Sequence, residues 1–508
     1  MENSVLNWLE KTVSLYPDKV AFESLEKRIS FQELELQAKR IGSKICEFDV
    51  SKTPIAVVLD KEVTTVSAFL GVVYSGRAYA PIDISLPESR IEIILSCLRA
   101  SIIITEAQYV EKLKALCDKA GIQTRILVLE DMLNGEIKEQ KLSDARRSMI
   151  ETDPLYVIFT SGSSGIPKGV VTSHHSLMCY IDAYVGVMGI DDKDKFGNQS
   201  PLDYIAAIRD IYIPLLKGAS TYLIPKNYFM QMDKLAEIVE GKGITALGWS
   251  TSALSVIASF GMPEAQKFAS VKKVCFSGSI MHGRVLRKWQ TMLPEALFVN
   301  QYGPTEATAS CTYYIIDHIV EEDETIPIGI PYKNYKIILL KEDLSEAGVG
   351  EEGEICIGGP ILALGYYNNL EKTRQDYIQN PLNTAFEEKI YKTGDIGEIM
   401  TDGLLYFHGR RDRQIKHMGH RVELDEIELT ANSITGIKEC CTLYNSEEET
   451  IWLFYSGEAE LKNLVKELRS KLPGFMVPRK VKQVDELPKL PNGKTDMSTL
   501  KQLAGIIK

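Results

Sequence analysis

The chain has 508 residues, a formal net charge of −11 and 25% charged residues, a composition typical of globular proteins. This length is too great for one ordinary hydrophobic core, so two or more domains are expected. The acidic balance argues against broad binding to a nucleic-acid backbone, which requires a basic face. A small anionic cofactor needs only a local basic site and stays possible.

Cysteine usage and the first residues favour a reducing compartment. The chain has nine cysteines, an odd number, and no CxxC pair, so neither a disulfide framework nor a zinc ribbon is expected. The first twelve residues lack the basic segment and apolar run of a signal peptide. The apolar stretch Val63–Ser75 is too short to span a bilayer. We therefore expect a cytoplasmic protein without membrane insertion.

Helical and strand patterns alternate along the chain, which predicts an α/β fold. Ser30 and Glu33 have the spacing of a capping box, and apolar residues then recur at helical spacing from Phe31 to Ile45. Glycine-rich turns follow several short apolar runs, the usual place for ligands in open parallel sheets. These runs, expected to be buried strands, are Ile55–Leu59, Tyr156–Phe159, Val274–Phe276 and Leu297–Val299.

The run Tyr156–Phe159 leads into a loop of hydroxyl residues and glycines, Thr160–Gly169. Glycines let the backbone turn sharply and aim N–H groups at phosphate oxygens, and Lys168 adds positive charge. The spacing is neither that of a P-loop nor that of a hydrolase nucleophile elbow. A Ser/Gly stretch alone is usually a surface loop, but the preceding strand and the Pro-Lys-Gly ending favour phosphate binding.

The carboxy-terminal part is expected to form a separate domain. Gly409–Arg413 is polar and dense in charge, which predicts a linker. A hairpin around Asn445–Thr450 and a helix with apolar residues from Leu461 to Leu472 should follow. The expected domains are therefore 1–411 and 412–508.

The loop Thr160–Gly169 resembles the phosphate loop of the adenylate-forming superfamily. That superfamily contains acyl-CoA synthetases, luciferases and the adenylation domains of nonribosomal peptide synthetases. One such match is weak, but further matches follow in the expected order over nearly the whole chain. They are Ala80–Asp83 with Pro87 and Arg90, Asn300–Glu306, Gly353–Gly359, Gly365–Tyr366, Tyr391–Asp395, Gly409–Lys416, Arg421–Glu428 and Pro491–Lys494. Leu364 stands where the family often has arginine. The nearest groups are stand-alone peptide-synthetase adenylation domains and D-alanine–carrier protein ligases.

The resemblance implies a large amino-terminal domain of layered sheets with helices and a small, mobile α+β carboxy-terminal domain. It implies ATP- and Mg²⁺-dependent adenylation of a small carboxylic or amino acid, with release of pyrophosphate. The acyl group would then pass to the phosphopantetheine thiol of a carrier protein. No carrier domain follows Lys494, so the carrier is expected to bind in trans. The alternatives are an acyl-CoA ligase and a catalytically dead binding protein.

The resemblance also implies roles for individual residues. Lys494 would bridge the substrate carboxylate and the α-phosphate, and Glu306 would hold Mg²⁺ near Thr160 or Thr305. Asp395 would accept hydrogen bonds from the ribose hydroxyls, and Arg410 would reach ribose or phosphate. The expected catalytic residues are Lys494, Glu306, Thr160 and Arg410. The expected nucleotide-binding residues are Thr160, Ser161, Gly162, Ser163, Ser164, Lys168, Gly278, Ser279, Asn300, Gln301, Tyr302, Gly303, Thr305, Asp395, Arg410 and Lys494.

Two further residues would serve the second half-reaction. By the same resemblance, Asp412 occupies the hinge position about which the carboxy-terminal domain would rotate. Gly419 would line the tunnel for the pantetheine arm, where the lack of a side chain permits close approach.

The expected acid pocket is unusually polar. Asp210–Gly218 resembles a block of the family, and this segment fixes the alignment. In that alignment Ile205 stands where α-amino-acid enzymes of the family carry the aspartate that binds the ammonium group. An unpaired ammonium there would be costly, and Arg209 would suit a hydroxyl-bearing, acidic or aryl acid. Alternatively, Arg209 pairs with Asp210, or a shifted register lets Asp203 bind an ammonium, as in a β-amino acid. The pocket residues are Asp203, Ile205, Ala206, Arg209, Ser252, Cys275, Ser277, Gln301, Ala309 and Ser310.

Overall fold

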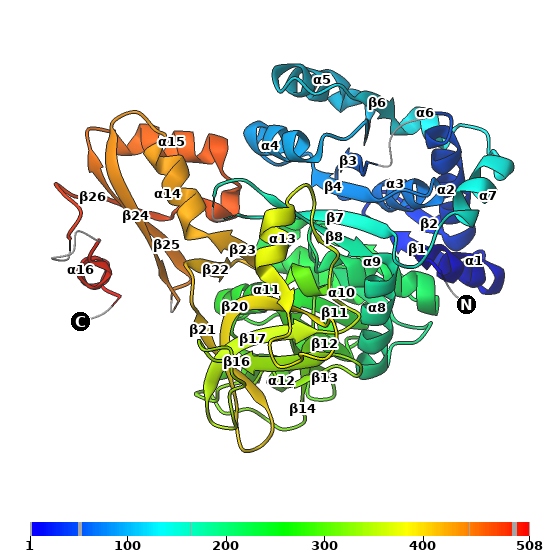
Figure 1. Ribbon diagram of the computed structural model, residues 1–508. Coiled ribbons are helices and arrows are strands. Elements are labelled where there is room, and N and C mark those ends of the chain that lie inside the picture. Colours follow the sequence, from blue (N-terminus) through cyan, green and yellow to red (C-terminus); the bar gives the residue numbers. More distant parts are fainter. Residues whose placement is uncertain (1–2, 49–52, 163, 447, 490–494, 507–508) are drawn as a thin grey trace. The chain divides into compact units, whose positions relative to one another are not determined.

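The computed structural model describes residues 3–48, 53–162, 164–446, 448–489 and 495–506 (Figure 1). The chain divides into two compact units. The larger unit comprises 1–84, 98–159 and 169–411, and the smaller unit comprises 85–97, 160–168 and 412–508. Helices and strands alternate as far as β13 (Leu297–Tyr302), as in the α/β class expected from the sequence, whereas strands predominate from β14 (Thr312–Ile316) to β23 (His420–Glu423). Two segments expected in the larger domain, 85–97 and 160–168, group with the smaller unit.

The largest sheet of the larger unit has nine strands in the order β15-β14-β13-β12-β11-β9-β10-β1-β2. Strands β11, β12 and β13 run parallel to one another, so their carboxyl ends meet at one edge of the sheet. The bounds are β1 (Val20–Glu23), β2 (Arg28–Ser30), β9 (Lys195–Asn198), β10 (Ser220–Leu223), β11 (Ala246–Ser250), β12 (Lys273–Ser277), β13 (Leu297–Tyr302), β14 (Thr312–Ile316) and β15 (Ile330–Pro331).

A second sheet has seven strands in the order β18-β8-β7-β4-β3-β5-β6. Strands β3, β4, β5 and β7 are largely buried and apolar, as expected for parallel strands covered on both faces. The strands predicted at Ile55–Leu59 and Tyr156–Phe159 are confirmed. The bounds are β3 (Ile55–Leu59), β4 (Tyr79–Asp83), β5 (Ile102–Thr105), β6 (Arg125–Val128), β7 (Pro154–Thr160), β8 (Lys168–Ser173) and β18 (Gly365–Tyr366).

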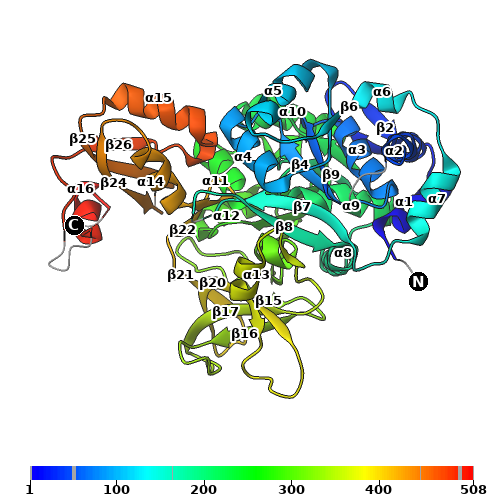
Figure 2. The same ribbon diagram turned by 45° about the horizontal axis from the view of Figure 1, so that its top comes forward.

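A third sheet, of five strands, is antiparallel. Figures 1 and 2 both show β16, β17 and β20 grouped at one end of the larger unit, away from β3 and β4. The predicted linker Gly409–Arg413 is wrong in its first part, because β21 continues to Arg410, which pairs with Asp395 of β20. The bounds are β16 (Lys336–Leu340), β17 (Glu352–Gly358), β19 (Tyr377–Gln379), β20 (Lys389–Ile399) and β21 (Leu405–Arg410).

Helices cover these sheets. The predicted capping box is confirmed: Ser30 Oγ accepts from the Glu33 N–H, and the Glu33 carboxylate accepts from the Ser30 N–H. Helices α2 and α3 pack closely at Gly71, where a Cβ would lie 2.5 Å from the side chain of Ile41. The bounds are α1 (Val5–Leu15), α2 (Phe31–Ile45), α3 (Val63–Tyr74), α5 (Val110–Lys119), α6 (Leu129–Leu133), α7 (Glu139–Arg147), α8 (His174–Met188), α9 (Ala207–Lys217), α10 (Met232–Lys242), α11 (Thr251–Phe260), α12 (Gly283–Met292) and α13 (Leu370–Asp376).

The smaller unit has its own apolar core. The predicted hairpin is confirmed, since β24 and β25 are antiparallel and Asn445 pairs with Thr450. The predicted helix is also confirmed, with Leu464 and Leu468 buried and Leu461 half exposed. The bounds are α4 (Glu88–Leu98), β22 (Gln414–His417), β23 (His420–Glu423), α14 (Leu424–Asn432), β24 (Ile437–Asn445), β25 (Thr450–Gly457), α15 (Leu461–Lys471), β26 (Lys480–Gln483) and α16 (Met497–Leu503).

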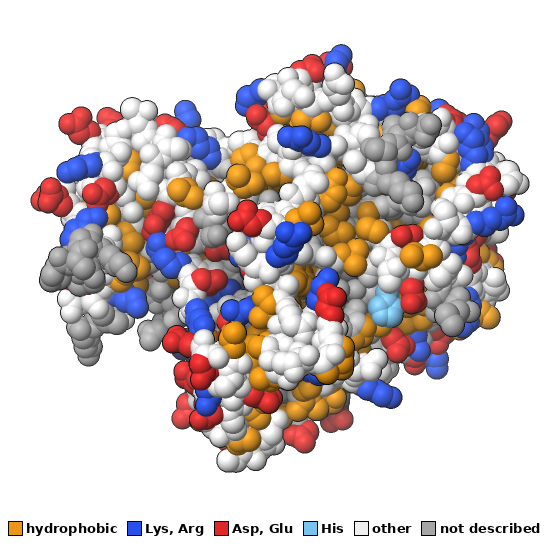
Figure 3. Space-filling view, in the orientation of Figure 1, with side chains coloured by type: hydrophobic (Ala, Val, Ile, Leu, Met, Phe, Trp, Pro, Cys, Tyr) orange, Lys and Arg blue, Asp and Glu red, His pale blue; other side chains and the backbone are white. Residues whose placement is uncertain are grey.

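The surface mixes charges of both signs. On the face shown in Figure 3, basic and acidic side chains alternate over the described residues. Among the helices that the structure describes, none combines the length and apolar character needed to cross a bilayer.

Candidate nucleotide and acid site

Tyr302, Asp395 and Arg410 come together from two sheets of the larger unit. Tyr302 ends β13, whereas Asp395 and Arg410 face each other on β20 and β21. The Tyr302 hydroxyl donates to Asp395 Oδ2, and the Arg410 guanidinium pairs with Asp395 Oδ1. Arg410 also donates to the Thr393 carbonyl at 3.0 Å. Burial, with the Asp395 charge beside it, holds the pKa of Tyr302 well above its usual range, so the phenol stays protonated as a donor.

A polar turn follows β12 in the same unit. Gly278 has a φ of +105°, a left-handed conformation that glycine adopts without strain. Thr251 Oγ1 donates to the Ser279 carbonyl at 3.1 Å and so holds the turn. Asn300, on the neighbouring strand β13, donates to the Pro327 carbonyl at 2.8 Å. The side-chain amide of Asn300 is therefore already hydrogen-bonded to a backbone carbonyl.

Glu306 lies in a short 3₁₀ turn, Thr305–Ala307, and is completely buried. The Tyr366 hydroxyl lies 2.8 Å from Glu306 Oε1 and 2.9 Å from Asp376 Oδ2. Asp376 also pairs with Lys372 at 2.7 Å. Glu306 and Asp376 have carboxylate oxygens, the kind of ligand that Mg²⁺ prefers.

The loop 160–168 belongs to the smaller unit, where acidic residues of the carboxy-terminal segment contact it. Ser161 Oγ donates to the Arg421 carbonyl at 2.7 Å, and Lys168 Nζ lies 4.0 Å from Glu423 Oε1. A Cβ on Gly162 would lie 2.1 Å from the Ile166 carbonyl oxygen, so only glycine fits the turn. The loop therefore combines a tightly turned backbone with a largely buried lysine that lies near Glu423.

A buried ion pair joins two other segments of the smaller unit. Arg90 of α4 donates to Glu426 of α14 at 2.5 Å, and both side chains are nearly inaccessible. Burial raises the pKa of Glu426, whereas the Arg90 charge lowers it. Removing one partner of such a pair leaves an uncompensated buried charge, so the pair fixes the two helices together.

Arg209 of α9 is almost completely buried, at 1% exposure. Its Nη2 donates to the Gly248 carbonyl, and its Nε lies 3.8 Å from Asp210 Oδ1. The neighbouring Cys275 thiol and Tyr184 hydroxyl lie 3.0 Å apart. The pairing with Asp210, which was the alternative to the polar pocket, is thus present as an ion pair, and Arg209 also lies beside Cys275.

Gln301 and Ser310 form the next part of this polar group. Gln301 Nε2 donates to the Tyr332 hydroxyl at 2.9 Å, and Ser310 Oγ lies 3.4 Å from Gln301 Oε1. Ala309 has a φ of +76° and lies in the turn before Ser310. A Cβ on Gly303 would lie 2.6 Å from the Ser310 Cα, so Gly303 permits this close approach.

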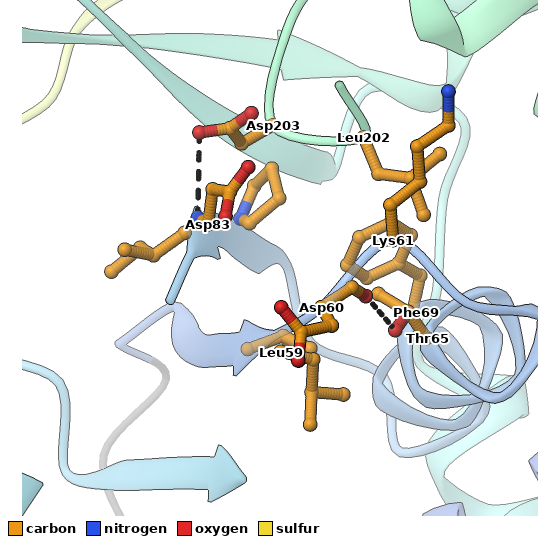
Figure 4. Close-up of a pocket in the computed structure, with 11 residues that line it drawn as sticks. Leu59, Asp60, Lys61, Thr65, Phe69, Asp83, Leu202 and Asp203 are labelled. Atoms are coloured by element: carbon orange, nitrogen blue, oxygen red, sulfur yellow. Dashed lines mark hydrogen bonds between the residues drawn. The ribbon is translucent and has the colours of Figure 1, made fainter. Parts of the chain in front are cut away.

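Asp203 lies in another environment (Figure 4). It lines a pocket with Asp60, Lys61 and Asp83, and its Oδ2 accepts from the Asp83 N–H at 3.4 Å. Lys226 pairs with Asp83. The Lys61 ammonium points away from the two aspartates and donates to three backbone carbonyls at 2.9–3.1 Å. Arg209 is not among the residues that line this pocket.

The partly buried Asp203 carboxylate predicts a pH-dependent stability difference. Burial, with the Asp83 charge, raises the pKa of Asp203 to about 6. A raised carboxyl pKa means that the fold favours the protonated form, so this stabilisation is lost as pH rises through 6. Asp203→Asn should therefore raise the unfolding free energy by about 1–2 kcal/mol at pH ~8, and the gain should shrink between pH ~6 and ~4.

Thermal unfolding across this pH range measures the difference. Asp118→Asn, at an exposed position on α5, is the matched control and should change stability little at any pH. An Asp203→Asn variant that is no more stable than the wild type at high pH would contradict the expectation.

The remaining predicted residues are placed as follows. Ile205 is buried and Ala206 directly precedes α9. Ser252 Oγ is buried and makes no hydrogen bond with any described residue. The Ser277 carbonyl accepts from Thr251 Oγ1 at 3.3 Å. Ser164 and Thr305 lie in the turns of their respective loops, whereas Ser163 and Lys494 lie outside the described residues.

The residues expected at the hinge and the tunnel lie at the start of the smaller unit's last segment, 412–508. Asp412 Oδ1 accepts from the Gln414 N–H at 3.2 Å. Gly419 joins β22 to β23, with φ values of +51° at Met418 and +79° at Gly419. Positive φ at both central residues is typical of a type I′ hairpin turn, which explains the glycine structurally as well.

Several functional neighbours were missed by sequence reasoning. Tyr366 lay within a matched motif but was given no role, although it binds Glu306. Tyr180 and Tyr184 are four residues apart on α8 and so share a helix face. Helical spacing could have paired those two tyrosines. It could not have placed them beside Arg209, which comes from another helix.

Unpartnered polar atoms test whether these residues suit a nucleotide. Thr160 Oγ1 and Ser279 Oγ are both buried and make no hydrogen bond within the described part of the chain. Thr160 belongs to the smaller unit and Ser279 to the larger one. Leaving either group unpaired costs free energy, which a polar ligand bound at that group would offset. The donor groups beside Asp395 and the carboxylates around Tyr366 fit a ribose and a Mg²⁺ ion by their chemistry.

Comparison with known proteins gives two family matches. The family described as AMP-binding enzyme matches residues 9–367, and its C-terminal domain matches residues 426–494. Tyrocidine synthase 1 of Brevibacillus parabrevis is 29% identical over 98% of this chain, and bacitracin synthase 1 of Bacillus licheniformis is 30% identical over 98%. The chain spans only 45% and 9% of these two relatives.

Other matches agree in length and in fold. Zwittermicin A synthase ZmaJ of Bacillus cereus is 29% identical, and the match covers 98% of this chain and 95% of the relative. The adenylation domain AlmE of Vibrio cholerae, solved with glycyl-adenosine-5'-phosphate, aligns with a TM-score of 0.83 at 21% identity. That alignment covers 99% of this chain and 98% of the other, so the fold extends over the whole length.

Proposed function

The chain belongs to the AMP-binding enzyme family, and on that premise we propose that it is an acid–thiol ligase that forms AMP. It would activate a small carboxylic or amino acid with ATP as an acyl-AMP and release pyrophosphate. It would then transfer the acyl group to the phosphopantetheine thiol of a separate carrier protein. The observation that carries this proposal is the cluster of Tyr302, Asp395 and Arg410 within a chain that the family matches almost throughout.

In the first half-reaction an oxygen of the substrate carboxylate attacks the α-phosphorus of ATP. The bond from that phosphorus to the bridging oxygen breaks, and pyrophosphate leaves with the electron pair. No side-chain nucleophile is needed, because the substrate supplies it. The barrier comes from bringing anions together, so cations and N–H donors must offset the charge. We assign this task to Lys494, Arg410, Lys168 and the loop around Gly162.

We propose the following contacts with the nucleotide and its metal ion. Asp395 would accept from the ribose hydroxyls, and Tyr302 with the turn Gly278–Ser279 would contact the adenine. Glu306 would hold Mg²⁺, with Thr160 or Thr305 nearby, and the ion would offset phosphate charge. Tyr366 orients Glu306 through the hydrogen bond described above.

In the second half-reaction the thiol sulfur attacks the acyl carbon, and AMP leaves. The two steps need different surroundings, because the first requires a closed site. We propose that residues 412–508 form a mobile domain that carries Lys494 and turns about Asp412. Gly419 would then border the path of the pantetheine arm. One structural neighbour is a protein containing adenylation and PCP domains, which supports a carrier protein as the acceptor.

Trapping the intermediate tests the proposal. Hydroxylamine attacks the acyl carbon of an acyl-AMP and yields the hydroxamate and AMP. Incubation of the full chain with ATP, Mg²⁺ and a broad panel of acids should yield one hydroxamate class together with AMP rather than ADP. ATP binding without hydroxamate from any acid would favour a catalytically inactive binding protein. Coenzyme A and a phosphopantetheinylated carrier, offered as rival acceptors, separate the carrier ligase from an acyl-CoA ligase.

Replacing Asp395 tests the assigned ribose contact. Asp395→Asn keeps the shape of the side chain but removes the charge that faces Tyr302 and Arg410. Because a hydrogen bond to a charged group is worth about 1.5–3 kcal/mol, KM for ATP should rise roughly tenfold or more. Glu398→Gln, on the same strand and paired with His408, is the matched control. Equal changes in both variants would argue against a ribose role.

A further inference from the structure

Arg209 is a buried cation that the chemistry of adenylation does not use. It is 1% exposed, and a guanidinium remains charged in proteins. One nitrogen, Nη2, donates to the Gly248 carbonyl, but Nε makes no hydrogen bond with any residue that the structure describes. A buried charge that is only loosely paired is costly, so its presence calls for an explanation.

The surroundings are built to accept this side chain. A Cβ on Gly248 would lie 2.5 Å from Arg209 Nε, so a glycine in the middle of β11 makes the space. Glycine weakens a strand interior and often marks a close approach. Asp210 uses its two oxygens differently: Oδ2 accepts from Asn198 at 2.8 Å, whereas Oδ1 lies 3.8 Å from Arg209 Nε and makes no hydrogen bond with any described residue. The ion pair is therefore loose, beyond hydrogen-bond distance.

Three groups that carry a hydroxyl or thiol hydrogen lie beside Arg209. Tyr180, Tyr184 and Cys275 all interact with its charge. The Tyr184 hydroxyl and the Cys275 thiol lie 3.0 Å apart and partner each other. Tyr180 Oη is buried and, like Arg209 Nε, has no hydrogen-bond partner in the described ranges. A ligand with negatively charged oxygens would supply an acceptor for both hydrogens.

The position of this cluster favours a bound ligand over a purely structural role. Its residues come from α8, α9, β11 and β12, and Gln301 of the neighbouring polar group lies on β13. Gly248 and Cys275 are paired in the middle of their strands, whereas Gln301 lies one residue before the carboxyl end of β13, where ligands bind in open parallel sheets. Gln301 directly precedes Tyr302, which contacts Asp395. The cluster thus adjoins the proposed nucleotide site.

We propose that Arg209 makes this enzyme selective for acids that carry a second carboxylate. One carboxylate of the substrate is adenylated, and the other accepts hydrogen bonds from Arg209 and the Tyr180 hydroxyl. The planar fork of a guanidinium matches the two oxygens of a carboxylate. A substrate ammonium would be repelled, and an alkyl end would leave the charge unpaired. This inference rests on the proposed adenylation function.

Substrate competition tests the inference. Pyrophosphate exchange is measured with acids of equal chain length that end in a carboxylate, a hydroxyl, an ammonium or a methyl group. The wild type should show its highest kcat/KM with the dicarboxylic member. Arg209→Met should lower that value by roughly 10–10²-fold, the range expected for a charged hydrogen bond. The methyl-ended acid should change much less.

Two further variants keep the test decisive if Arg209→Met fails to fold. Arg209→Lys keeps the charge but not the fork, so it should restore part of the dicarboxylate activity. Tyr180→Phe removes only the unpartnered hydroxyl and should reduce kcat/KM for the dicarboxylic acid several-fold, with little change for the methyl-ended acid. Thermal unfolding of each variant confirms that it folds.

Three results would overturn the inference in different ways. Equal losses on all acids in both Arg209→Met and Tyr180→Phe would make the cluster structural. A wild-type preference for an ammonium-ended acid that Asp203→Ala abolishes would assign recognition to Asp203. If the best substrate in the exchange reaction were an acid with a hydroxyl or methyl end, the inference would be wrong, but the adenylation function would stand. No exchange with any acid would instead contradict the proposed function itself.

Discussion

Replacing Lys494 with alanine should slow acyl-adenylate formation by roughly 10²–10³-fold, the loss typical of one charge contact made in a transition state. In the proposed mechanism this ammonium bridges the attacking carboxylate and the α-phosphate, where negative charge accumulates. Thiol attack on preformed acyl-AMP needs no such bridge. Thioester formation from supplied acyl-AMP should therefore continue near the wild-type rate. Separate rate measurements for the two half-reactions give the comparison.

A second lysine provides the control. Lys489 lies shortly before Lys494 in the chain, and its Nζ pairs with Glu439 at 2.7 Å. Lys489→Ala removes an exposed charge from the same segment and should leave both half-reactions near their wild-type rates. If Lys494→Ala slowed both half-reactions equally, the lysine would not have the assigned role. Lys494 lies outside the described residues, so this role rests on the PNGK motif and on the chemistry.

Replacing Asp412 with proline should reduce thioester formation by roughly 10²-fold, the loss expected when reacting groups are misplaced by about 1 Å. Proline fixes φ and removes the N–H, so a chain that must turn at this residue loses that freedom. Adenylation should fall much less, because it needs only one of the two domain arrangements. The full reaction with carrier, compared with pyrophosphate exchange, measures the two effects separately.

Asp412→Ala distinguishes rotation from loss of the side chain. Alanine also removes the hydrogen bond from the Gln414 N–H but leaves φ free. Thioester formation should therefore be far closer to the wild-type rate than in Asp412→Pro. Unchanged thioester formation in Asp412→Pro would place the hinge elsewhere or show that no rotation is needed.

Local elements could be predicted from the sequence because their signals are local. The capping box at Ser30 and Glu33 and the hairpin at Asn445 and Thr450 depend on residues within a few positions of one another. The end of β21 was harder to predict. Arg410 has the polarity of a linker residue, but it pairs with Asp395, fifteen positions earlier. Such strand pairing is not visible in local composition.

Residues of the site could be predicted from the sequence only where they belong to a recognisable motif. Tyr302 and Asp395 belong to different motifs, and their direct hydrogen bond joins strands of two separate sheets. The space for Arg209 depends on Gly248, 39 positions away. The pocket around Asp203 depends likewise on Asp83. These contacts arise from the packing of sheets and helices, which periodicity and motif spacing do not encode.

Acid-dependent exchange of labelled pyrophosphate into ATP tests the central claim most directly, because exchange requires reversible formation of an acyl-AMP. The full chain, with ATP, Mg²⁺ and a broad acid panel, should incorporate label only when its acid is present. Incorporation should be greatest with a dicarboxylic acid and should fall sharply in Lys494→Ala. Nucleotide binding without incorporation from any acid, or incorporation independent of acid, would contradict the assignment as an adenylate-forming ligase.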